Sequence, residues 1–159
     1  MSRRLDYPQV APELTKKLYE LSQASSQSTV DRTLRDLILL RVSQLNHCAF
    51  CVDMHVKEAK IHGEREPRLH HVAVWRESPL FSEKEKAGLE WAESVTLVSE
   101  TNVPDEVYER VKKQFSPKEL VDLTFAIGVI NFWNRLGVSF RAEPGSMDKA
   151  LGLDRAEMR

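Results

Sequence analysis

The chain has 159 residues, enough for one domain with a hydrophobic core that needs no disulfide bridges for its stability. Its 23 basic and 24 acidic residues leave a net charge of −1, which excludes the strongly basic surface typical of nucleic-acid-binding or membrane-surface proteins. No apolar run is long enough to cross a membrane. The polar N-terminus, residues 1–14, lacks a signal-peptide core. We therefore expect a cytoplasmic protein.

The pattern along the chain predicts an all-α fold. Pro12 is suited to a first helical position, and Leu14, Leu18 and Leu21 follow at helical spacing. A polar Ser/Gln loop is expected over residues 24–29. A leucine-rich helix over residues 31–45 should then be largely buried, and Asp31 is a candidate cap. The expected core covers about residues 12–141 of a single domain, 1–159.

The later helices are marked by their start signals. The next helix begins near residues 46–47 and ends at Gly63, and a shorter helical pattern covers about residues 67–75. Ser82 to Glu85 and Ser116 to Glu119 are capping boxes. They predict helices to about residue 99 and along the apolar stretch to Phe140, with another helix over residues 105–115 between them. Residues 143–159 should form a tail with a loop, a short helical turn and a mobile end.

Both cysteines of the chain lie in one short motif, Cys48-Ala49-Phe50-Cys51-Val52-Asp53-Met54-His55. On a helix, Cys48, Cys51 and His55 share one face, because they are three and four residues apart. A helix N-terminus and a neighbouring base both favour the reactive thiolate. His55 can therefore accept the Cys51 proton, and Cys48 can attack an oxidised Cys51 to form a disulfide. This chemistry suits a thiol-disulfide or peroxide-reducing enzyme.

Two other interpretations of the motif stay open, and a third is excluded. The cysteines could be buried and unreactive. They could also bind zinc together with His55, with His47 or another chain as the fourth ligand, although no second ligand pair follows. Covalent haem attachment requires a histidine directly after the second cysteine, where this chain has Val52.

Asp36 is the candidate carboxylate for this site. If the helices on either side of residues 46–47 form an antiparallel hairpin, Asp36 lies within about a turn of His55 and can orient its imidazole. The alternative is a solvated aspartate favoured by the helix dipole.

Asn131 and Asn134 are poor mid-helix residues in an apolar helix. If their side-chain amides are buried, they need hydrogen-bond partners. These amides could fix a turn, form a subunit contact or line the wall of the site, and a structural role is favoured over a catalytic one.

The segment from Leu40 to His55, together with Leu34-Arg35-Asp36-Leu37, resembles the AhpD-like branch of the carboxymuconolactone decarboxylase family. The resemblance extends through Trp75-Arg76-Glu77 to Asn131-Phe132-Trp133-Asn134-Arg135, covering about residues 30–141. It implies an AhpD-like fold that forms trimers or hexamers. It also implies alkylhydroperoxidase activity with no bound cofactor or metal.

By matching position, the resemblance implies that Cys51 is peroxidatic, Cys48 resolving and His55 a relay histidine. At the position of the family's relay glutamate this chain has Asp36, whose side chain is one methylene shorter. At the position where the best-known AhpD has a histidine inside the motif, this chain has Phe50. Decarboxylases of the superfamily lack the cysteine pair. We therefore expect a thiol peroxidase that uses a small hydroperoxide and an external dithiol, thioredoxin-like or lipoyl-type. The alternative is a thiol-disulfide oxidoreductase or redox adaptor.

Overall fold

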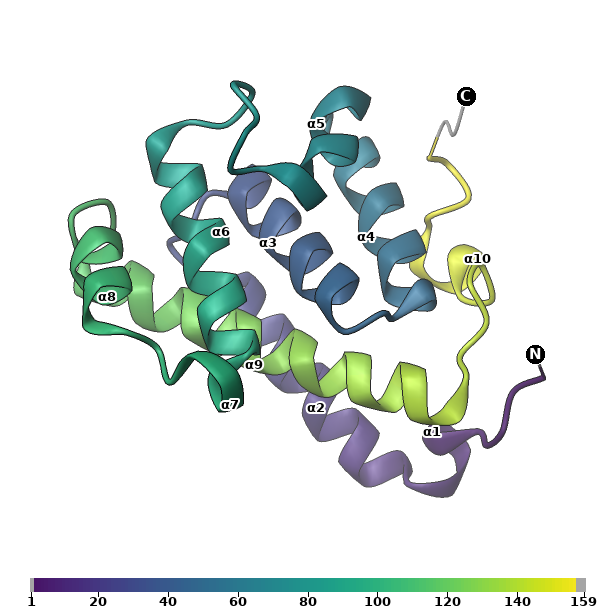
Figure 1. Cartoon of the computed structure of the whole chain (residues 1–159). Coiled ribbons are helices and arrows are strands. Elements are labelled where there is room, and N and C mark those ends of the chain that lie inside the picture. The colour runs from purple at the N-terminus through teal and green to yellow at the C-terminus, as the bar shows by residue number, and fades with distance from the viewer. Residues whose placement is uncertain (1, 157–159) are drawn as a thin grey trace.

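The computed structural model describes residues 2–156, and in that range the secondary structure consists of helices only, as the sequence predicts (Figure 1). The elements are α1 (Tyr7–Val10), α2 (Pro12–Ser26), α3 (Arg32–Leu45), α4 (Ala49–Ile61), α5 (Glu66–His71), the 3-10 helix η1 (Val72–Val74), α6 (Glu83–Thr96), α7 (Val98–Thr101), α8 (Asp105–Lys112), α9 (Pro117–Phe140) and α10 (Asp148–Leu151).

Helix α3 is the centre of the fold. It contacts α4, with which it forms a hairpin, and also α6 and α9. Leu37, Ile38, Leu40 and Val42 have no exposed surface, because neighbouring helices cover nearly every side of α3. The long helix α9 runs across one end of α3, α4 and α6, and α2 packs along its outer side (Figure 1). The site described below lies among α2, α3, α4 and α9.

The local start signals are confirmed. The Asp31 side chain accepts a hydrogen bond from the Leu34 backbone N–H at 3.1 Å, and both predicted capping boxes are formed, with Ser82 and Ser116 as their first residues. The predicted C-terminal ends of the helices are less accurate than the predicted starts. Helix α2 continues to Ser26, into the predicted loop, and the helix after Ser82 divides into α6 and α7. The predicted mobile end includes residues 157–159, which lie outside the described residues.

A cluster of three amides, of which Asn134 is buried and Asn46 and Asn131 are half-buried, fixes the α3–α4 turn to α9. Asn46 Nδ2 donates to Asn131 Oδ1 at 3.0 Å and to Asn134 Oδ1 at 2.9 Å. Asn134, fully buried, donates in turn to Ser43 Oγ at 3.1 Å. The asparagines in the apolar helix therefore have partners, and their structural role is confirmed.

We expect Asn134→Ala to lower the free energy of unfolding by about 1 to 3 kcal/mol, because the substitution leaves Asn46 and Ser43 with unmet hydrogen bonds in the interior. Urea denaturation followed by circular dichroism measures the change. The matched control is Arg135→Ala, the next residue of α9, whose exposed side chain bonds only within its own helix. Equal stability losses in the two variants would contradict the expectation.

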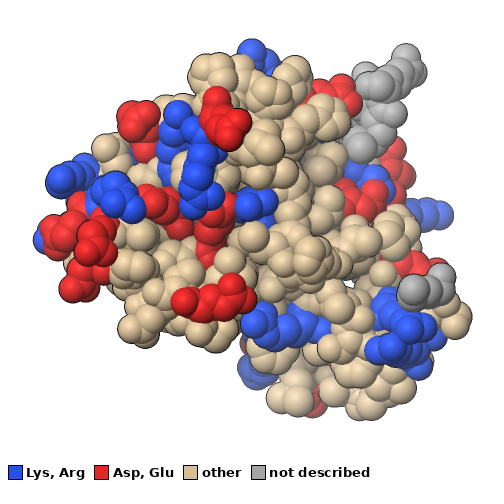
Figure 2. Space-filling view, in the orientation of Figure 1, with Lys and Arg blue, Asp and Glu red and all other residues tan. Residues whose placement is uncertain are grey.

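The charged side chains on the face shown in Figure 2 are of both signs, interleaved rather than gathered into one large field. This agrees with the net charge of −1. Within the described part of the chain, no helix has the length and apolar character to span a membrane.

Candidate active site

The cysteine pair sits at the start of α4. His47, in the left-handed region with φ of 54°, ends the turn after α3, and Cys48 is the N-cap residue of α4. The Cys48 sulfur accepts the Cys51 backbone N–H at 3.4 Å, and the two cysteines form a disulfide. Each is only 1% exposed. Cys51 and His55 therefore lie on one face of α4 as predicted, and Cys48 lies one position before the first residue of the helix.

Helix α9 approaches the sulfur atoms at Gly137. A Cβ atom added there would lie 2.8 Å from Cys48 Sγ and 3.5 Å from Cys51 Sγ. Glycine lets the helix backbone pass this close, and any side chain would displace the pair. Sequence reasoning missed this residue, although a glycine inside a long apolar helix is an available signal, because it is a poor helix former.

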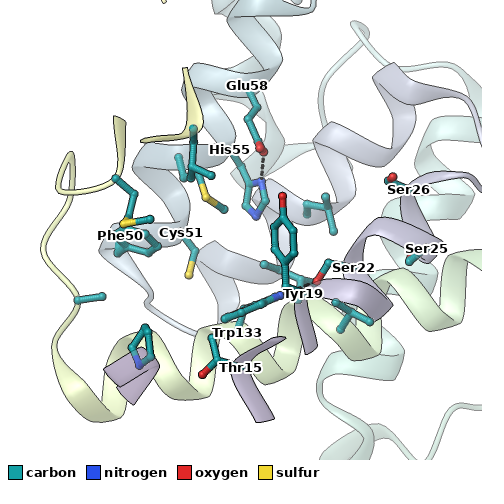
Figure 3. Close-up of a pocket in the computed structure, with 18 of the residues that line it drawn as sticks. Thr15, Tyr19, Ser22, Ser25, Ser26, Phe50, Cys51, His55, Glu58 and Trp133 are labelled. Atoms are coloured by element: carbon teal, nitrogen blue, oxygen red, sulfur yellow. Dashed lines mark hydrogen bonds and ion pairs between the residues drawn. The ribbon is translucent and has the colours of Figure 1, made fainter. Parts of the chain in front are cut away.

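His55 lies one turn after Cys51 and is 4% exposed. Its Nδ1 is 2.7 Å from Glu58 Oε2, on the same face of α4 (Figure 3). Burial alone would raise the pKa of Glu58, but the hydrogen bond and charge of His55, assisted by His62 and Arg35, hold that pKa below its ordinary value. The other ring nitrogen, Nε2, is buried and has no hydrogen-bond partner among the described residues. It faces the open space beside Cys51 in Figure 3.

Asp36 is buried at 4% exposure, so the solvated alternative for this residue is wrong. Its Oδ2 lies 2.6 Å from Nδ1 of His62, at the end of α4, and the carboxylate bound to His55 is that of Glu58. Burial raises the pKa of Asp36, and the His62 hydrogen bond and charge offset only part of this effect. A role for Asp36 in the relay stays a prediction. Glu58 could have been found from the His-x2-Glu spacing, which places both side chains on one helical face.

A cavity of about 710 Å³ brings these residues together. Cys51, His55, Glu58, Asp36 and His62 all line it, whereas Cys48 does not. Most of the remaining wall is apolar. It is contributed by α2, α3, α4, α9 and the segment around α10, and includes Leu39, Phe50, Met54, Ile130, Trp133 and Met147. The Tyr19 ring of α2 projects into the same space (Figure 3).

The zinc interpretation gains no support from these positions. In residues 2–156, no three His, Cys, Asp or Glu side chains are grouped so that they could hold a metal ion. The two cysteines are bonded to each other, and His47 is exposed. The arrangement instead supplies one sulfur atom facing a cavity, a second sulfur bonded to it, and a buried imidazole with a carboxylate partner.

Residues 12–94, just over half of the chain, match the sequence profile of the carboxymuconolactone decarboxylase family. The chain belongs to this family. It is 42% identical over 139 residues to YdfG of Bacillus subtilis, an uncharacterized protein, and the match covers 87% of this chain and 95% of YdfG. Family and fold are therefore those that the motif predicted.

Two solved structures share the fold of this chain. The Agrobacterium tumefaciens protein ATU0492, a protein of unknown function for which an AhpD role in antioxidant defence has been suggested, superposes with a TM-score of 0.88 at 42% identity. The match covers 90% of this chain and 98% of that one. The debrominase Bmp8 shares the fold, with a TM-score of 0.74 at 17% identity over 92% of this chain and 78% of its own. The fold thus also occurs in an enzyme that carries out debromination, and the fold alone does not select a reaction.

Proposed function

We propose that this AhpD-like protein is a thiol-dependent peroxidase that reduces hydroperoxides through its cysteine pair. The observation that carries the proposal is the asymmetry of the pair. Cys51 lines the cavity beside His55, whereas Cys48 lies away from the cavity and is bonded to Cys51. A substrate in the cavity therefore meets one sulfur atom, and the second sulfur is already placed to resolve the oxidised product.

The reaction begins with the reduced pair. His55 takes the Cys51 proton, and the thiolate attacks one oxygen of the hydroperoxide. The S–O bond forms, the O–O bond breaks, and the departing alkoxide takes the proton from His55 to become an alcohol. Cys48 then attacks the Cys51 sulfenic acid, forming the disulfide and releasing water. An external dithiol restores the two thiols and is itself oxidised to a disulfide.

The largely apolar wall of the cavity supports an organic hydroperoxide as the small-molecule substrate, because apolar lining favours an apolar substituent over water. For the electron donor we retain a thioredoxin-like or lipoyl-type dithiol. We also retain a cytoplasmic location, because a close cysteine pair in a reducing compartment is typically catalytic rather than a structural bridge.

A homo-oligomer, trimeric or hexameric, is part of the proposal. Val121, Phe125 and Phe132 form a stripe along α9, each at least 54% exposed, and Leu14 of α2 is 75% exposed. Exposed apolar stripes of this kind mark interaction surfaces. Contact with further copies of the chain would cover them.

A thiol-disulfide oxidoreductase is the second candidate, and one observation favours it. Cys48 occupies the N-cap position and already accepts the Cys51 backbone N–H, an arrangement that stabilises a thiolate at Cys48 rather than at Cys51. In that case Cys48 would attack disulfides of a partner, and peroxide turnover would be slow.

Steady-state assays distinguish the two functions. Reduced protein is mixed with cumene hydroperoxide, hydrogen peroxide or a small-molecule disulfide, with dithiothreitol, dihydrolipoamide or thioredoxin as the donor. The proposal expects the highest kcat/KM with the organic hydroperoxide. Efficient reduction of the disulfide without consumption of either peroxide would overturn the peroxidase assignment in favour of the second candidate.

Glu58→Gln tests the imidazole–carboxylate pair. The amide keeps the size of the side chain but removes the negative charge that stabilises protonated His55, so we expect kcat/KM for hydroperoxide to fall by about 10- to 100-fold. The matched control is Glu66→Gln, whose side chain is 52% exposed and lies away from the cavity. Unchanged kinetics in Glu58→Gln would remove Glu58 from the mechanism.

A further inference from the structure

The α10 segment, defined here as residues 142–153, forms one side of the active-site cavity. Figure 3 shows its yellow ribbon beside Phe50, next to the start of α4. At its first residue, the Ala142 backbone N–H donates to the Gly137 carbonyl at 2.9 Å, and Gly137 is the residue packed against the cysteine pair. The segment therefore supplies wall close to the sulfur atoms, through Ala142, Ser146, Met147 and Leu151.

An ion-pair network holds the α10 segment on α4. Lys57 Nζ lies 2.7 Å from Asp53 Oδ2 and 2.6 Å from Asp148 Oδ2, and the Lys57 side chain is only 12% exposed. Asp53 Oδ2 also accepts the Gly145 backbone N–H at 3.0 Å. Gly145 has a φ of 79°, which residues with a side chain rarely adopt, so glycine allows the turn that presents this N–H. The network therefore links α4 both to the turn at Gly145 and to the start of α10.

The charge of Lys57 is built into this network. Burial alone would lower the pKa of Lys57, but the hydrogen bonds and charges of Asp148 and Asp53 raise it above its ordinary value. Asp53 belongs to the cysteine motif, between Cys51 and His55, yet it does not line the cavity and the proposed reaction does not use it. The motif thus carries the reacting groups on one side of α4 and an anchor for the cavity wall on another.

The middle of the α10 segment depends on this anchor. Among the described residues, the hydrogen bonds from α4 to the segment are those of Lys57 and Asp53. Leu153, at the far end, is buried. Between the anchors, Met147 and Leu151 line the cavity but are still 43% and 40% exposed. An apolar group bound in the cavity against these two side chains would remove their surface from water.

We propose that the α10 segment, docked by Asp53 and Lys57, makes the cavity selective for hydroperoxides that carry an apolar substituent. The proposal rests on the proposed function, because it concerns the selectivity of the same cavity. The substituent packs against Met147 and Leu151 while the peroxide group meets Cys51. Hydrogen peroxide has no substituent and gains nothing from this wall. Lys57 and Asp53 are positioning residues, and Met147 and Leu151 determine specificity.

The first test measures binding without turnover. The oxidised protein is titrated with 2-phenyl-2-propanol, the alcohol that corresponds to cumene hydroperoxide, and tryptophan fluorescence is followed, since Trp133 lines the cavity. Lys57→Met keeps the apolar stem of the side chain and removes its charge, whereas Met147→Gln keeps the length and adds a polar amide. We expect Kd to rise at least about fivefold in both variants, because the loss of a small apolar contact in a binding pocket has an effect of this order.

Two control variants should bind the alcohol as wild type does. Lys60→Met changes another lysine of α4, whose ion pair with Glu66 is long, at 3.8 Å. Lys149→Gln changes an exposed residue of α10 that does not line the cavity. Hydrogen exchange followed by mass spectrometry should be faster over residues 142–153 in Lys57→Met and unchanged in Met147→Gln, because only the first substitution releases the anchor. Circular dichroism establishes that each variant is folded.

The second test is kinetic. The ratio of kcat/KM for cumene hydroperoxide to that for hydrogen peroxide should fall at least about fivefold in Lys57→Met and Met147→Gln, with the value for hydrogen peroxide retained. An unchanged ratio in both variants would overturn the proposal. So would undetectable binding of the alcohol to wild type, or unchanged binding in both variants. Unchanged hydrogen exchange in Lys57→Met would overturn the role of the ion-pair network.

The binding test contains no peroxide, so its outcome is separate from that of the proposed function. A protein that consumes no hydroperoxide would lose the peroxidase assignment. Weaker binding of the alcohol in both variants would still show that the α10 segment selects apolar ligands for this cavity.

Discussion

Cys51→Ser is expected to abolish hydroperoxide consumption, with kcat/KM reduced by roughly 10³-fold or more, because the serine hydroxyl cannot replace the thiolate as nucleophile. Cys51 lines the cavity next to the imidazole of His55, so the substitution removes the atom that we propose attacks the substrate. Coupled consumption of hydroperoxide and dithiol measures the effect. Serine differs from cysteine by one atom, so folding should be preserved.

Cys48→Ser is the matched variant, since it changes the other sulfur atom of the same motif. It should react with one equivalent of hydroperoxide and then stop, because the Cys51 sulfenic acid has no resolving thiol. Mass spectrometry should detect the added oxygen atom, and a sulfenic-acid trap such as dimedone should label Cys51. The reverse pattern, with oxidation retained in Cys51→Ser and lost in Cys48→Ser, would assign the attack to Cys48 and support the oxidoreductase candidate.

Gly137→Ala should destabilise the fold by about 1 to 3 kcal/mol, because the added methyl group would lie 2.8 Å from Cys48 Sγ. The methyl group lies on the helix backbone and cannot rotate away, so the start of α4 must move. Since this movement displaces Cys48 Sγ, the proposed resolving sulfur, we also expect slower disulfide formation after peroxide treatment. Urea denaturation and quantification of free thiols measure the two effects.

Gly128→Ala supplies the control on the same helix. No atom lies within 4 Å of a Cβ placed at Gly128, so alanine there should raise stability by about 0.5 to 1 kcal/mol through its better helix propensity. The decisive result is a lower free energy of unfolding for Gly137→Ala together with a higher one for Gly128→Ala. Equal effects would show that α9 tolerates a side chain against the cysteine pair.

Much of the fold could be predicted because its signals are local. The capping boxes at Ser82 and Ser116 each satisfy backbone N–H groups within four residues, so the surrounding structure does not alter them. Cys48, Cys51 and His55 share a helical face for the same reason, since helical geometry alone sets their spacing. The helix ends were less certain, because the last turn of a helix depends on tertiary contacts.

The rest of the site depends on long-range packing. Gly137 meets Cys48 only because α9 crosses the start of α4, 89 residues later in the sequence, and no local pattern encodes that crossing. Asp36 was correctly placed near the second helix of the hairpin, but its hydrogen bond is with His62 rather than His55. The hairpin pattern indicates which turns are opposite each other. It does not indicate which of several polar side chains on those turns form the bond.

The position of the disulfide has a consequence for chain entropy. Cys48 and Cys51 are only three residues apart, so their bond closes a very small loop and removes few conformations from the unfolded chain. By the loop-closure relation the bond contributes only about 2 kcal/mol, well below the contribution of a bridge that spans a domain. The native state is therefore held together by its helical core in both redox forms. In the proposed redox cycle, opening and closing the pair would therefore leave most of the free energy that maintains the fold in place.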